Sequence, residues 1–154
     1  MTDIALTWRD ALMEADIALD GARLATDDGL LTAILISLFT DAPARPDDVL
    51  PAEGARGGWW GDAVPAQAGD VIGSRLWLLS RAKRLADVAV VARGYAEEAL
   101  KWLLDDGVVA AIAVETAAAG DVLAIGVTVT RPAGGGRQRY DFTWSATARE
   151  LSGR

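Results

Sequence analysis

Apolar residues alternate with polar ones in two short stretches near the start of the chain. The alternating apolar positions are Ile4, Leu6, Trp8, Ile17 and Leu19. A period of two is typical of a strand with one buried face. We therefore expect an N-terminal pair of short strands arranged as a hairpin, with a turn at Asp20-Gly21 after the second strand.

Three later segments carry apolar residues at the spacing of a helix. They run from the N-cap candidates at 26–28 to Asp41, from about Ser74 to Arg84, and from Asp87 to about Asp105. In the first segment, Leu30, Ile34 and Leu38 fall on one helical face, and acidic residues precede it, as is common at helix starts. We therefore expect about three helices.

The C-terminal part alternates again, in three stretches linked by glycine-rich turns. The expected strands cover 108–114, 123–129 and 140–144. Together with the earlier elements they predict an α/β (α+β) fold with an N-terminal strand pair, about three helices and a C-terminal three-stranded antiparallel sheet. Residues 1–144 are expected to form a single domain, and 145–154 a C-terminal arm or tail.

A long stretch without periodicity separates the first two helical segments. It runs from Asp41 to Ile72 and holds four of the five prolines. Loops of this length inside a compact domain usually have a function. In its middle stands the sequence Gly-Gly-Trp-Trp-Gly-Asp at 57–62.

The six tryptophans fall into two groups. Those on patterned elements, which we expect in the core, are Trp8, Trp77, Trp102 and Trp144. The adjacent pair Trp59 and Trp60 lies in the glycine-rich loop, where tryptophan is favoured as an interface anchor. Either one of the two plugs the core and the other is exposed, or both hold something between them.

Composition excludes several classes of chemistry. The 154 residues include no cysteine and no histidine, which removes disulfides, thiol nucleophiles, zinc sites built on these residues and Ser-His-Asp triads. The net charge of −7 disfavours nucleic acids and anionic membranes as partners. No apolar run is long enough to span a bilayer, and no signal sequence is present, so the chain should stay in the cytoplasm where it is made.

Carboxylates remain as candidates for catalysis. The adjacent pairs are Asp27-Asp28, Asp47-Asp48, Glu97-Glu98 and Asp105-Asp106. A glycosidase needs two carboxyl groups facing each other across a sugar, whereas neighbours on a helix diverge. Asp47-Asp48 and Glu53 also lack the spacing of a calcium loop. We therefore expect no catalytic, cofactor or metal site.

Five blocks along the chain resemble the baseplate protein family of Mu-like phages and prophages. In order, they are Asp-Ile-Ala-Leu-x-Trp at 3–8, Asp-Gly-Leu-x-Thr-Ala at 28–33, Arg-Gly-x-Trp-Trp-Gly-Asp at 56–62, Gly-Ser-Arg-Leu-Trp-Leu-Leu at 73–79 and Tyr-Ala-Glu-Glu-Ala-Leu-x-Trp-Leu at 95–103. The resemblance extends from Asp3 to Trp144, and the third and fourth blocks are its most specific parts.

That family is similar in turn to the gpW-like, lysozyme-like-named sheath initiators of contractile tails. The resemblance implies a structural wedge component of the inner baseplate ring, made in the host bacterial cytoplasm and located in the virion. Its partners would be other baseplate wedge proteins and tail sheath subunits, with the tail tube or spike hub nearby and copies arranged around a symmetric ring. The Glu-Pro-Arg tripeptide with which the initiators of large phages dock onto the wedge bundle is absent here, so the docking contact stays open.

We single out six residues as candidates for contacts with partners. They are Trp59, Trp60, Asp62 and Arg75 in and after the loop, and Tyr140 and Phe142 on the last strand. Arg75 could instead pair with Asp62 and brace the loop. Two other functions stay open: a glycan-binding module that uses Trp59 and Trp60, and a carboxylate-based glycan hydrolase.

Overall fold

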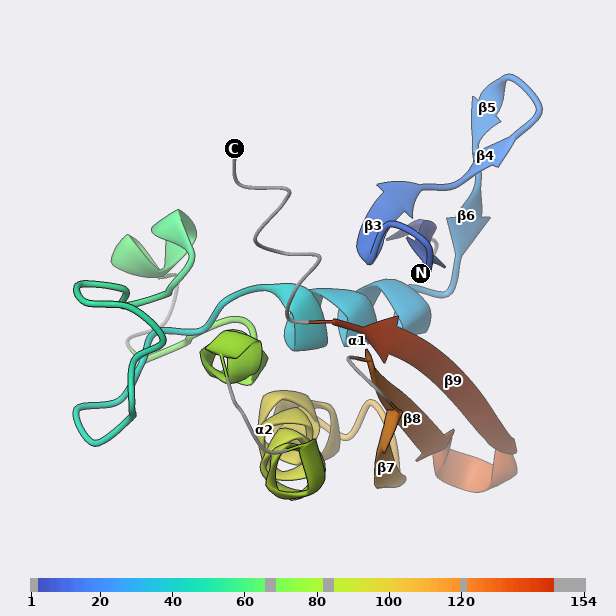
Figure 1. Ribbon diagram of the computed structural model, residues 1–154. Helices are drawn as coiled ribbons and strands as arrows, with labels where there is room; N and C mark the ends of the chain where they lie inside the picture. Colours follow the sequence, from blue (N-terminus) through green and yellow to red (C-terminus); the bar gives the residue numbers. More distant parts are fainter. Residues whose placement is uncertain (1–2, 66–68, 82–84, 120–121, 146–154) are drawn as a thin grey trace.

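The computed structural model describes residues 3–65, 69–81, 85–119 and 122–145 (Figure 1). Its strands are β1 (Asp3–Ile4), β2 (Leu6–Arg9), β3 (Glu14–Ile17), β4 (Leu19–Asp20), β5 (Arg23–Leu24), β6 (Thr26–Asp27), β7 (Ala111–Ala119), β8 (Val122–Thr130) and β9 (Arg137–Trp144). Its helices are α1 (Leu30–Phe39) and α2 (Leu85–Asp105), with 3₁₀ helices η1 (Trp60–Ala63), η2 (Leu76–Arg81) and η3 (Pro132–Gly134). Within these ranges no helix is long and apolar enough to cross a membrane.

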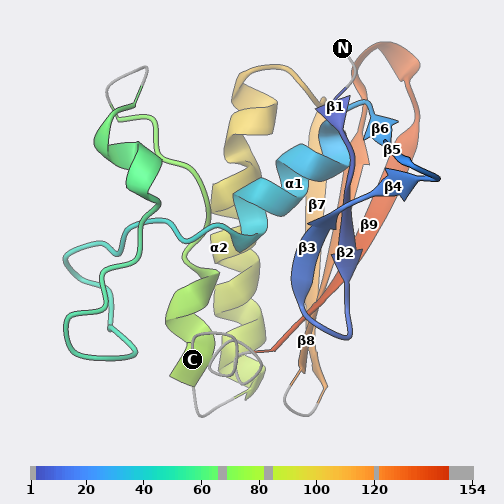
Figure 2. The same ribbon diagram turned by 90° about the horizontal axis from the view of Figure 1, so that it is seen from above.

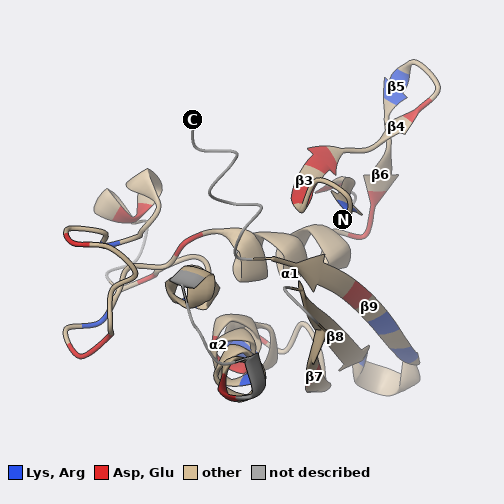
Figure 3. Cartoon of the chain, viewed as in Figure 1, with Lys and Arg blue, Asp and Glu red and all other residues tan. Residues whose placement is uncertain are grey.

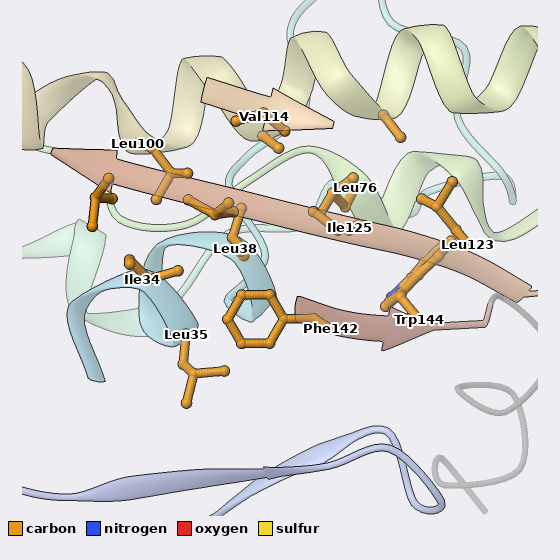
Figure 4. Packing of buried hydrophobic residues seen from close by; sticks show 14 of the residues in the cluster. Ile34, Leu35, Leu38, Leu76, Leu100, Val114, Leu123, Ile125, Phe142 and Trp144 are labelled. Atoms are coloured by element: carbon orange, nitrogen blue, oxygen red, sulfur yellow. The ribbon is translucent and has the colours of Figure 1, made fainter. Parts of the chain in front are cut away.

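The C-terminal strands form the predicted three-stranded antiparallel sheet, in the order β7-β8-β9. Alternate residues of β8 are buried on one face, and these are Leu123, Ile125, Val127 and Val129. Helices α1 and α2 pack against this face and complete the core, as Figure 4 shows. The other face of β8 carries the smaller residues Ala124, Gly126, Thr128 and Thr130, and no described element covers it.

Helix α1 begins directly after the predicted N-cap candidates at 26–28, with Gly29 and not one of them at the N-cap position. Asp27 Oδ1 accepts a hydrogen bond from the backbone N–H of Gly29 (2.7 Å), and Asp28 Oδ1 accepts one from Leu30 (3.2 Å). These carboxylates satisfy amides that the first turn of a helix leaves unpaired. The helix then buries Ile34, Leu35 and Leu38 between the sheet and the N-terminal strands.

The prediction of a second α-helix from about Ser74 to Arg84 is wrong. Over 76–81 the chain forms the 3₁₀ helix η2, and 82–84 lie outside the described residues, so the described chain has two α-helices and not three. Four consecutive residues, Leu76 to Leu79, are buried. A segment enclosed on all sides has no solvent-facing stripe, so its leucines at i and i+3 fit a 3₁₀ turn as well as an α-helix.

The start of η2 is fixed to the end of α1. The Ser74 hydroxyl donates to the carbonyl of Leu38 (2.5 Å) and accepts from the backbone N–H of Leu76 (3.2 Å). The backbone N–H of Ser74 donates to Thr40, and Ala42 donates back to Ser74 (both 2.9 Å). These bonds bring both ends of the long loop together.

The N-terminal strand pair is present, but it is part of a larger arrangement. β2 pairs with β3 as the predicted hairpin, and Asp20-Gly21 belongs to a second hairpin, β4–β5, while β1 pairs with β6. The three ladders meet at Ala5, Ala18 and Ala25. Each alanine donates its N–H to the next one's carbonyl around a closed triangle, Ala5 to Ala25, Ala25 to Ala18 and Ala18 to Ala5, all at 2.9 Å.

The prediction of a buried face on the second strand is wrong. Ile17 and Leu19 are exposed, as is Leu24, which pairs across from Leu19. The β4–β5 hairpin projects away from the body of the molecule (Figure 1), so no core lies beneath it. Of the first predicted strand, Leu6 and Trp8 in β2 pack against the main core, whereas Ile4 in β1 is exposed as well, so the prediction is wrong there too.

Truncating the core residue Leu100 to alanine should destabilise the protein much more than truncating Leu104. The two leucines lie one turn apart on α2, but Leu100 is fully buried and Leu104 is 40% exposed. We expect L100A to lower the free energy of unfolding by about 2–5 kcal/mol, and L104A to lower it clearly less. Urea denaturation followed by circular dichroism measures the free energy of unfolding of both variants. Equal losses would show that Leu100 does not lie on the core face of α2.

Candidate partner-binding surfaces

The long loop is attached to the body by a network around Arg75. The Arg75 guanidinium donates through Nη1 to Asp48 Oδ1 (2.6 Å) and through Nη2 to Glu98 Oε2 (2.8 Å). It also lies over the ring of Tyr95, 4.5 Å from the ring centroid. The side chains of Arg75 and Asp48 are only 11% and 8% exposed, so this ion pair is largely removed from water.

Arg45 extends the network to a second point of the loop. Its Nη2 donates to Glu98 Oε1 (2.8 Å), and its backbone N–H donates to Asp48 Oδ2 (2.7 Å). Burial by itself would lower the pKa of Arg75, but its hydrogen bond to Glu98 and the charges of Glu98 and Asp48 outweigh this effect and raise the pKa. The guanidinium therefore stays charged, and it joins the loop, η2 and α2.

Asp62 braces the loop at a different place. Its Oδ2 accepts from the backbone N–H of Trp59 (3.2 Å), and its Oδ1 accepts from that of Ile72 (3.3 Å). Arg75 thus does brace the loop, but its partners are Asp48 and Glu98 and not Asp62. Asp62 instead closes the turn of η1 on which both loop tryptophans are presented.

Trp59 and Trp60 both face outward. They are 44% and 83% exposed, and their rings touch, with centroids 5.1 Å apart and planes tilted by 49°. Gly61 allows this arrangement because a Cβ there would lie 2.0 Å from the Trp59 ring. Neither side chain plugs the core, and rings in mutual contact leave no gap between them for a ligand.

Trp77 covers the core beneath the loop instead. It is buried, and its Nε1 donates to the carbonyl of Ala42 (2.8 Å). The chain passes close over its ring at Gly57, where φ is +63° and a Cβ would meet the ring at 2.4 Å. The adjacent Gly-Gly pair thus carries the chain over Trp77 before it turns out at the exposed tryptophans.

The last strand offers a partly open edge. The N–H of Thr143 donates to Asp10 Oδ1 (3.0 Å), and its carbonyl accepts from Trp8 Nε1 (3.2 Å). In an antiparallel strand, alternate residues direct both backbone groups to the same side. Asp141 and Arg139 therefore direct theirs to this outer side, where no described strand pairs with them.

The two candidates on β9 differ in their surroundings. Phe142 is 3% exposed and packs edge-on against Phe39 (centroids 5.6 Å) and Trp8 (6.2 Å), so its side chain belongs to the core of this chain. Tyr140 is half-buried at the margin of the same core, and this burial raises its pKa. Arg139, which precedes Tyr140, points to the other face and donates to Glu115 (2.5 Å) and Asp141 (2.9 Å), and β9 carries two arginines followed by an aspartate (Figure 3).

Residues 30–136 of this chain match the family described as phage protein GP46. The chain is 51% identical over 115 residues to baseplate protein gp46 of Escherichia phage Mu, covering 74% of this chain and 76% of that protein. It is 42% identical over 147 residues to the Mu-like prophage FluMu protein gp46 of Haemophilus influenzae, covering 94% of this chain and 99% of that protein.

The chain belongs to the phage GP46 family. The resemblance to Mu-like baseplate proteins is thereby confirmed, and with it the expected place of the protein as a structural component of a phage tail baseplate. The family match includes the long loop, the Arg75 network and α2, but it ends before β9 begins.

The sequence identified Arg75 but missed its partners. Asp48 and Glu98 each belong to an adjacent carboxylate pair, and such pairs are usually helix caps or solvated surface. They lie 27 and 23 residues from Arg75, and no periodic pattern connects positions at these separations. The block in which Arg75 follows Gly-Ser was the only local signal.

A double-mutant cycle should show strong coupling between Arg75 and Asp48 in the isolated protein. With R75A, D48A and the double variant, we expect a coupling free energy of about 1–3 kcal/mol, because the pair is largely desolvated. The matched cycle of R75A with D62A should give a value within about 0.5 kcal/mol of zero. Urea denaturation supplies the free energies, and the reverse ranking would contradict the network described here.

Proposed function

We propose that this GP46 family protein joins the inner wedge ring of the baseplate and provides a β-edge on which the first sheath ring assembles. The outer edge of β9 is the observation that supports this most. Along Arg137–Asp141 this edge has no strand neighbour in the described part of the chain. Natural monomers usually protect such edges, and an open edge pairs readily with a strand from another chain.

The geometry limits where an added strand would lie. The contacts of Thr143 with Trp8 and Asp10 close the end of the edge nearest the N-terminal hairpin. A partner strand would therefore pair along Arg137–Asp141 and stop before Thr143. Ser145 is buried at the end of the strand, and the remainder of the predicted C-terminal arm, 146–154, lies outside the described residues. We propose that this arm adds to the contact.

In this proposal the partners are other baseplate wedge proteins and tail sheath subunits, with the tail tube or spike hub as neighbours. Copies stand around the symmetric ring of the tail. Trp59 and Trp60 face the wedge partner, because exposed tryptophans on a rigid support are typical anchors of interfaces. Asp62 and Arg75 hold this surface in place, and Tyr140 lies beside the edge that pairs.

The proposed role is structural and not catalytic. Each adjacent carboxylate pair has at least one member engaged in an ion pair. The engaged members include Asp28 with Arg131, Asp48 with Arg75, Glu97 with Arg93, Glu98 with Arg45 and Arg75, and Asp105 with Lys101. Carboxylates held by cations are poorly suited to proton transfer, which weakens the hydrolase alternative. The glycan-binding alternative loses support because Trp59 and Trp60 touch each other and form no clamp.

Replacing Arg139 with proline should block sheath assembly while alanine at the same position should not. Both variants lose the ion pairs to Glu115 and Asp141, but only proline removes the outward N–H. Proline is tolerated on edge strands, so the fold should survive. In a Mu-like phage lacking its own copy of the gene, electron microscopy should show sheathed tails with R139A and baseplates without sheath with R139P.

Two controls make this outcome interpretable. Circular dichroism and urea denaturation of both purified variants establish that R139P is folded. If folded R139P supports as many sheathed tails as R139A, strand addition along β9 is not the mechanism.

Deleting residues 146–154 should lower the number of sheathed tails without preventing incorporation of the protein into baseplates. The deletion removes only residues outside the described elements, and urea denaturation of the purified protein checks that the remaining chain is folded. Counting sheathed tails by negative-stain microscopy measures the effect. An unchanged count would remove the arm from the proposal.

A further inference from the structure

A groove of about 780 Å³ lies between three parts of the molecule. Its walls are the turn at Trp59–Asp62, the outward face of α1 and the C-terminal end of α2, which lie on the same side of the molecule in Figure 2. The contacts of Asp62 with Ile72 and of Ser74 with Leu38 hold the loop wall beside α1. The contacts that anchor the loop therefore also form the groove, and no residue of β9 lines it.

The groove exposes several large apolar side chains that the fold leaves unburied. Those exposed by 37–86% are Ile36, Trp59, Trp60, Val64, Val71 and Trp102. Trp102 is among them, so the prediction that it belongs to the core is wrong. Its Nε1 donates to the Ser37 hydroxyl (2.9 Å), which ties the ring to α1. Contiguous exposed apolar surface of this kind is typical of a protein-binding site.

The charges around the groove are of one sign. Four aspartates contribute to its lining, and no lysine or arginine does among the described residues. Among the described residues, Asp62 and Asp3 accept hydrogen bonds only from backbone N–H groups. Asp70 and Asp106 make no ion pair within the described ranges. No basic side chain of the described residues neutralises these negative charges, so they favour a cationic occupant.

We propose that this groove binds an amphipathic segment of a neighbouring baseplate protein, with apolar side chains on one face and Lys or Arg side chains beside it. That the segment belongs to a baseplate protein rests on the proposed function. Its apolar and cationic character is inferred from the groove alone. The apolar side chains enter between Trp60, Val71 and Trp102, and the cations reach Asp70 and Asp106. Nucleic acids and anionic lipids are excluded because the same aspartates repel them.

Two synthetic peptides without tryptophan test this chemistry on the purified full-length protein. Both form amphipathic helices with identical apolar residues, and they differ only in carrying Lys or Glu at the polar positions. We expect the Lys peptide to change the tryptophan fluorescence saturably and the Glu peptide to have no effect. Added salt should weaken the binding of the Lys peptide because it screens the charges. The W60A variant should also bind the Lys peptide more weakly, because an apolar contact is lost.

Matched charge variants localise the binding. The double variant D70N/D106N should weaken binding of the Lys peptide by about threefold to tenfold, the amount expected for two exposed charge pairs. The double variant D20N/D47N changes the net charge equally at two exposed sites away from the groove, and it should leave the affinity unchanged.

Three results would overturn the proposal: no binding of the Lys peptide, equal binding of the Glu peptide, or equal weakening by both double variants. Each can occur whether or not R139P blocks sheath assembly, because this titration needs no baseplate. The proposal for the groove and the proposal for the β9 edge can therefore be refuted independently of each other.

Discussion

The ion pair between Arg75 and Asp48 is the interaction on which the presentation of the long loop depends. It is largely desolvated, and removing one partner would leave the other charge largely buried with only part of its compensation. Glu98 adds a second carboxylate contact from α2, and Arg45 binds that same carboxylate from inside the loop. A segment rich in proline and glycine, with little core of its own, is thereby attached to α2, a helix that packs against the main core.

This attachment explains how a small protein can hold large apolar side chains at its surface. Trp59 and Trp60 are supported by each other and by the turn that Asp62 closes, so little conformational entropy remains to be lost when a partner binds. The same anchoring forms the groove beside α1. The sheet contributes separately through the edge of β9, and the two surfaces together suit a protein that connects neighbours in a baseplate.

Sequence reasoning succeeded where a repeating pattern reports burial and failed where distant residues meet. Alternation at Leu123, Ile125, Val127 and Val129 predicted the central strand because one face of β8 is buried. The same rule failed at Leu19, whose hairpin projects into solvent without a core beneath it. Pattern reasoning failed again over Leu76–Leu79, because a segment buried on all sides has no alternation of apolar and polar positions from which to predict its structure. The partners of Arg75 could not be predicted, since only the fold brings Asp48 and Glu98 to it.

Amide hydrogen exchange across the loop tests most directly whether it is held rigid in the free protein. The N–H of Ala44 bonds the carbonyl of Arg56 (2.8 Å), and that of Asp62 bonds Trp59 (3.0 Å). We expect both amides to exchange far more slowly than in an unstructured chain, and to lose this protection together when Arg75 is replaced by methionine while the amides of α2 keep theirs. Exchange of Ala44 and Asp62 at the rate of an unstructured chain in the unmodified protein would contradict the account.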